Sequence, residues 1–168
     1  MPRVVRHLVV YVMLHSDHAS STGTSVLDGN EHRARVDAWM ERAAKEAPPE
    51  RLFDAFESAF GAMWRRARVT LGDVTLMAIL GRVLYTAAER FPLLSPLEVD
   101  ATGLRSDKFR QRAGSLHRDQ LGEGIRFILV EFLTVLGNLT AEVLTPALHA
   151  ELAKVAAKDA VRGEEAES

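Results

Sequence analysis

One stretch of the sequence decides the fold: residues 125–144 read IRFILVEFLTVLGNLTAEVL. Leu, Ile, Val and Phe fall on nearly every side of a helix drawn through these residues. A helix that is apolar all round is buried at the centre of a domain. The sequence therefore predicts a hydrophobic central helix over about residues 121–144, with further helices packed around it.

Three segments with helical periodicity precede this stretch, and a short helix lies between them and the centre. The segment at 50–67 has apolar residues spaced by three, four, seven and eight, which marks one buried face. The Pro residues at 48 and 49 separate it from the helix before it. The predicted helices are 31–47 after an Asn30 cap, 50–67, 74–91 after an Asp73 cap, and 107–114 after a Ser106 cap.

Two connections are less regular. Residues 93–104 carry the turn signals Ser95-Pro96 and Thr102-Gly103, which predict an irregular loop. Pro146 disfavours helix at Thr145, so either the central helix kinks there or a new helix begins at Thr145.

Length and composition bound the organisation of the chain. With 168 residues, the chain forms one domain and is short for two. The absence of cysteine excludes disulfides, thiolate metal sites and a Cys nucleophile. We therefore predict an all-α, single-domain bundle of five to six helices. Its division is an N-terminal extension and linker (1–29), a helical domain (30–158) and a disordered acidic tail (159–168).

The N-terminal residues leave three interpretations open. Residues 1–15 contain Arg3, Arg6 and a short apolar run, as in a signal peptide, a buried strand or an extension ahead of the domain. A signal peptide at residues 1–19 is disfavoured, because the apolar run is short and His15-Ser-Asp-His18 is a poor cleavage approach. The prediction is a cytoplasmic protein, and the excess of Arg over Lys suggests a bacterial genome. No run of apolar residues is long enough for a membrane span.

The central block carries a line of polar residues. If the helix is continuous, Glu131, Asn138, Glu142 and His149 lie on one narrow face, with Thr134 and Thr145 beside them. Carboxylates, an amide and an imidazole together can bind a small molecule or a metal ion. The alternative interpretation is the solvent-facing strip of an otherwise buried helix. The four residues named first are the candidate ligand-binding residues; the metal, if any, stays unknown.

A second group of potential metal ligands surrounds the N-terminal loop. It comprises His15, Asp17, His18, Asp28, Glu31 and His32. Because helical register cannot be assumed there, accidental clustering in a polar linker is the favoured interpretation.

Local basic residues form a third candidate site, a patch for an anionic partner. Arg at a helix end more often caps the helix and aids solubility. The net charge of −2 also argues against nucleic acid as the main partner. The patch consists of Arg65, Arg66, Arg68, Lys108, Arg110 and Arg112.

Motifs for catalysis are missing from the sequence. It contains no nucleophile elbow, Walker loop, dinucleotide fingerprint or paired Glu-x-x-His of a dimetal bundle, and no cofactor is evident. The sequence therefore favours a non-catalytic binding or regulatory module that acts through protein–protein contacts, with a protein partner or a second copy of the chain. The alternatives are a small-molecule or metal-binding helical sensor that uses the polar line, and a nucleic-acid-binding regulator that uses the basic patch.

Overall fold

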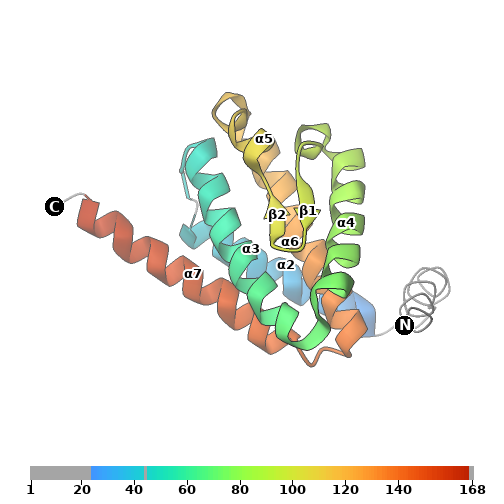
Figure 1. Ribbon diagram of the computed structural model, residues 1–168. Coiled ribbons are helices and arrows are strands. Elements are labelled where there is room, and N and C mark those ends of the chain that lie inside the picture. The colour runs from blue at the N-terminus through green and yellow to red at the C-terminus, as the bar shows by residue number, and fades with distance from the viewer. Residues whose placement is uncertain (1–23, 44, 167–168) are drawn as a thin grey trace.

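The computed structural model describes residues 24–43 and 45–166, with the side chains of residues 29–43 and 45–156. Within these residues the fold is an all-α bundle, as the sequence predicts (Figure 1). One small hairpin is added to it, which the sequence does not predict. The helices are α2 (Thr24–Ala43), α3 (Pro49–Leu71), α4 (Asp73–Arg90), α5 (Asp107–Arg110), α6 (Arg118–Thr140) and α7 (Thr145–Ala166). Two single-turn 3-10 helices, η1 (Pro92–Leu94) and η2 (Ala113–Ser115), and the strands β1 (Glu98–Asp100) and β2 (Gly103–Arg105) complete it.

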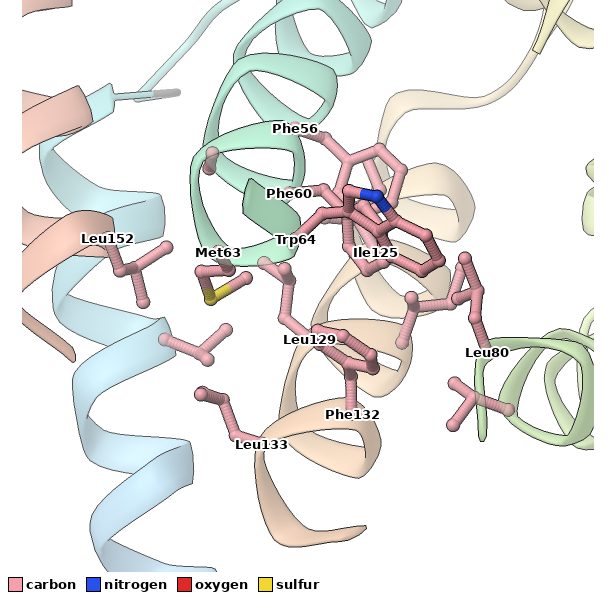
Figure 2. Packing of buried hydrophobic residues seen from close by; sticks show 14 of the residues in the cluster. Phe56, Phe60, Met63, Trp64, Leu80, Ile125, Leu129, Phe132, Leu133 and Leu152 are labelled. Carbon is pink, nitrogen blue, oxygen red and sulfur yellow. The ribbon is translucent and has the colours of Figure 1, made fainter. Parts of the chain in front are cut away.

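Helix α6 is the centre of the bundle. It packs against α2, α3 and α4, and also contacts α7. Ile125, Leu129, Phe132 and Leu133 are fully buried and meet side chains from several helices (Figure 2). The predicted central helix is confirmed, although it ends at Thr140.

Helix α3 contributes an aromatic stripe to the same core. All six residues of the predicted apolar face are buried: Leu52, Phe53, Phe56, Phe60, Met63 and Trp64. The ring of Phe60 lies 4.8 Å from that of Phe132 on α6, and the ring of Phe53 lies 4.5 Å from that of Phe109 on α5. The helical spacing of these rings therefore reports a buried face.

The connection at 93–104 is more ordered than the sequence predicts. It forms η1 and an antiparallel hairpin in which Val99 pairs with Leu104. The Asp100 carboxylate accepts hydrogen bonds from the amide and hydroxyl of Thr102, which closes the turn. Gly103 has φ +121°, and a Cβ there would lie 3.5 Å from the ring of Trp64. Turn signals thus marked a hairpin in this segment.

Both terminal helices extend beyond their predicted bounds. Helix α2 begins at Thr24, inside the predicted linker, because one interior glycine (Gly29) weakens a helix by only about 1 kcal/mol. Helix α7 continues to Ala166, inside the predicted disordered tail, where Ala, Glu and Arg favour helix. The strand, signal-peptide and extension interpretations of residues 1–15 lie outside the described residues.

The chain reverses between α6 and α7. Ala141 and Glu142 have left-handed backbones, with φ 47° and 63°, and the amide of Glu142 donates to the carbonyl of Gly137 at 2.8 Å. Helix α7 begins at Thr145 with Pro146 in its first turn, so the second alternative for this segment is correct. It packs against α3 and α2. None of the helices in the described part of the chain is long and apolar enough to cross a membrane.

Candidate functional site

The reversal after Thr140 divides the predicted polar line between three places. Glu131 is half-buried on α6, and Asn138 is exposed on its last turns. Glu142 lies in the connection, and His149 lies on α7. The single continuous helix that would align all four residues does not form. The fold nevertheless brings Glu142 and His149 to the same site, because the chain turns back on itself between them.

The centre of this site is a pair of histidines from two helices. His32 on α2 is only 1% exposed, and its Nδ1 lies 3.0 Å from Nε2 of His149 on α7. This distance is that of a hydrogen bond. Which ring donates and which accepts depends on the tautomers of the two rings. The two rings meet edge to face, with centroids 5.2 Å apart. We call these two residues the histidine pair.

A carboxylate faces each outer nitrogen of the histidine pair. Nε2 of His32 lies 4.0 Å from Oε2 of Glu142, and Nδ1 of His149 lies 3.9 Å from Oε1 of Glu31. Both separations are too long for a direct hydrogen bond. Nε2 of His32 is buried and has no hydrogen-bond partner among the residues that the structure describes. The arrangement is therefore a row of four groups, Glu142, His32, His149 and Glu31.

Three groups of this row, Glu142, His149 and Glu31, line a hollow of about 490 Å³ beside α2 and α7, which we call the α2/α7 hollow. Its charged side chains come from α2, α7 and the connection between α6 and α7. The lining residues are Glu31, Arg35, Glu142, Thr145, Pro146, His149, Ala150 and Ala153. His32 does not line the hollow; it is hydrogen-bonded to His149, which does.

The backbone around Glu142 holds its carboxylate over the end of α6. The hydroxyl of Thr145 donates to Oε2 of Glu142. A Cβ at Gly137 would lie 2.8 Å from the carboxyl carbon of Glu142, so a side chain there would push the carboxylate aside. Glycine at 137 and the left-handed backbone at 142 together place this carboxylate facing His32.

Burial decides the charge of His149. Loss of solvent and the nearby ring of His32 lower the pKa of His149 below its ordinary value of 6.5, while the carboxylate of Glu31 opposes this shift. Arg35 also lowers this pKa, and Glu142 raises it. The net direction is downward, so His149 is neutral at pH 7.

Metal ligation is the less suitable chemistry for this site. Among the residues that the structure describes, no three His, Asp or Glu side chains are arranged to hold one metal ion. The two carboxylates lie near opposite ends of the histidine pair, so one ion cannot reach both within a coordination distance of about 2 Å. Of the predicted N-terminal ligands, Glu31 and His32 join the site. His15, Asp17, His18 and the side chain of Asp28 lie outside the described residues.

The predicted basic patch is partly neutralised by ion pairs. Arg68 pairs with Asp73 and Lys108 with Glu98. Arg110 pairs with Asp54 and Glu57. These carboxylates reduce the positive field on which an anionic partner would depend.

Arg65 and Arg68 instead line a second hollow, of about 570 Å³, between α3 and the hairpin. Trp64 and Asp73 line the same hollow, so its charged groups have both signs. Arg66 and Arg112 are exposed.

The sequence gave no role to Gly137, and it placed Glu31 and His32 only in a loose N-terminal cluster that was interpreted as accidental. One signal for His32 is its spacing of four and seven residues from Val36 and Trp39, which places it on the buried face of α2. No signal in a single sequence pairs it with His149. Comparison of the chain with protein-family models, curated proteins and solved structures finds no match.

Proposed function

We propose that the protein is a small-ligand-binding module, with its ligand seated in the α2/α7 hollow against His149. The observation that carries this proposal is the buried His32. Within the described part of the chain its Nε2 has no hydrogen-bond partner, and its Nδ1 is hydrogen-bonded to His149, which lines the hollow.

Energetics support this interpretation over a purely structural one. An unsatisfied buried polar group costs about 1–3 kcal/mol. An apolar side chain at position 32 would avoid that cost, because it has no polar atom to leave without a partner, and it would suit the buried face that it shares with Val36. Buried polar groups without partners in a native protein call for an explanation, and a functional site is one of the few.

The backbone at Glu142 is a second, independent support. A residue other than glycine in the left-handed region costs about 1–2 kcal/mol, and such strain gathers at functional sites. Here it places a carboxylate beside the histidine pair. The volume of the hollow also falls within the range of about 300–1,000 Å³ typical of small-molecule pockets.

The experiment is a thermal-shift measurement on the full chain with small amines, carboxylates, sugars and divalent metals. We expect at least one class to raise the melting temperature of the wild type and to have no effect on His149→Ala. His117→Ala is the matched control, because His117 is exposed at the start of α6 and does not line the hollow.

Two results would contradict the proposal. One is a panel in which no compound changes the melting temperature of the wild type. The other is a shift of equal size in His149→Ala, which would place the ligand elsewhere. The protein-contact function favoured by the sequence stays a prediction, as does its nucleic-acid alternative.

A further inference from the structure

We infer that the α2/α7 hollow takes the ammonium group of an organic amine, which donates hydrogen bonds to Glu31 and to Nδ1 of His149. This inference rests on the proposed function and adds the chemical class of the ligand. It follows from counting protons along the row of four groups.

With both rings neutral, the histidine pair holds two ring protons for four ring nitrogens. One proton lies in the bond between Nδ1 of His32 and Nε2 of His149. If His32 donates that bond, its Nε2 is bare and faces the carboxylate of Glu142. If His149 donates it, Nδ1 of His149 is bare and faces the carboxylate of Glu31. In either tautomer, the lone pair of one outer ring nitrogen faces a carboxylate, and the two repel each other.

The row therefore lacks one positive charge. A third ring proton would let both outer nitrogens carry N–H groups toward the carboxylates. Burial opposes that solution, because a charged pair would lose its solvation: the side chains of His32 and His149 are only 1% and 9% exposed, and burial lowers the pKa of His149. A cation that arrives from solvent can supply the missing charge without protonating a buried ring.

The lining of the hollow selects the kind of cation. Glu31 and Glu142 give it two carboxylates against one guanidinium, that of the exposed Arg35, which lies 3.6 Å from Glu31. A metal ion needs ligands that converge on one point, and the described residues provide no such set. An ammonium group needs only hydrogen-bond acceptors around it, and the exposed carboxylate of Glu31 and a bare imidazole nitrogen are two of them.

Binding of an ammonium group also replaces the lone pair on the buried Nε2 of His32 by an N–H group. The ammonium donates a hydrogen bond to Nδ1 of His149, which must then be bare. This favours the tautomer in which Nε2 of His149 donates to His32. In that tautomer Nε2 of His32 carries a proton and faces Glu142. With one ligand bound, no ring lone pair faces a carboxylate in this row.

The test is an NMR titration of the full chain, with ¹⁵N-labelled histidine, by the diamine putrescine at pH 7. Ring ¹⁵N shifts separate bare from protonated nitrogens, so they report the tautomer directly. We expect saturable binding with Nδ1 of His149 bare and its Nε2 protonated. Butanediol, of similar length and without charge, and succinate, with the opposite charge, should leave the spectra unchanged.

Matched variants locate the contact. Glu31→Gln should weaken putrescine binding about tenfold, because a charge-assisted hydrogen bond is lost. Glu41→Gln, an exposed carboxylate on the same helix outside the hollow, should bind putrescine as the wild type does. Affinity should also fall as the pH is lowered from 7 to 5, since a proton then competes for Nδ1 of His149.

The outcomes separate this inference from the proposed function. Ring shifts that putrescine leaves unchanged, or that butanediol changes equally, would overturn the ammonium assignment. If succinate, a sugar or a divalent metal binds in a manner that depends on His149, the ligand class is wrong and the proposed function holds. If nothing in the panel binds, both are wrong.

Discussion

Single residues with unusual surroundings gather at the junction of α6 and α7. Ala141 and Glu142 are consecutive residues with positive φ, and neither is glycine. A side chain in this region meets its own backbone, at a cost of about 1–2 kcal/mol per residue. Helix α6 ends here because the amide of Glu142 returns to the carbonyl of Gly137. The backbone strain at Glu142 is offset by contacts of its carboxylate with Thr145 and His32. Ala141 has only a methyl group, which can make no such polar contact.

This difference predicts that Ala141→Gly stabilises the protein. Glycine removes the left-handed cost but adds roughly 0.5–1 kcal/mol of backbone entropy in the unfolded chain, so the net gain is about 0.5–1 kcal/mol. Urea denaturation would measure it from the transition midpoint. A loss of stability would mean that the methyl group of Ala141 contributes packing that its exposed position does not suggest.

The histidine pair predicts a pH dependence with a definite sign. Because burial lowers the pKa of His149 from 6.5, the unfolded chain binds this proton more readily than the folded protein. The stabilisation from neutral His149 is complete above pH 6.5. It is lost as the pH falls from 6.5 toward the lowered value in the folded protein.

Denaturation curves between pH 7 and 5 would measure this effect on wild type and His149→Gln. We expect the difference in unfolding free energy between them to shrink as the pH falls. Ser58→Ala, at an exposed site without an ionisable side chain, should keep a constant difference from wild type. A constant difference for His149→Gln as well would contradict the prediction.

At the scale of elements, α3 and α6 form the contact that organises the core. The ring of Phe60 lies between those of Phe56, Trp64 and Phe132, at centroid distances of 5.7, 6.5 and 4.8 Å (Figure 2). Aromatic pairs at such distances add about 0.5–1.5 kcal/mol beyond the effect of burial. The stripe that predicted α3 is thus also the surface that fixes its position on α6.

Truncating this stripe should destabilise the protein strongly. Phe60 is 1% exposed, so Phe60→Ala loses transfer free energy and leaves a cavity, at a cost of about 3–5 kcal/mol. Ser58→Ala, at an exposed position on the same helix, should change stability by less than about 0.5 kcal/mol. Chemical denaturation would measure both. A cost below about 1 kcal/mol for Phe60→Ala would show that the cavity collapses or that this face is not core.

At the scale of the whole molecule, helices enclose α6 while the hairpin lies at the surface between α3 and α4 (Figure 1). The strands of the hairpin have three residues each and are only partly buried. A two-stranded hairpin contributes little stability of its own in water. It is held by its contacts, β1 against α4 and β2 against α3.

Native-state hydrogen exchange should show that the hairpin opens at a lower free energy than α6. Amides of α6 around Leu129 and Phe132 should exchange only through global unfolding, because the helix is enclosed by its neighbours. Amides of residues 98–105 should exchange through local opening with a smaller free energy. Equal protection of the two regions would mean that the hairpin unfolds together with the core.

The sequence alone determined the helical elements and the centre of the fold. Apolar residues at helical spacing predict α3 and α4 within a few residues, and the apolar stretch at 125–144 predicts the buried α6. These features are readable because burial of a helix face depends on spacing within one segment. Helix ends were less predictable: Pro146 marks the start of α7, but no glycine or proline within residues 141–145 marks the left-handed backbone at Ala141.

Only the tertiary structure decided the site. Glu142 and His149 were predicted together on a continuous helix, yet they meet because the chain reverses between them. His32 joins His149 across 117 positions of sequence. A single sequence carries the polarity of each helix face but does not state which two faces will meet. The histidine pair therefore exists only once α2 and α7 pack against each other.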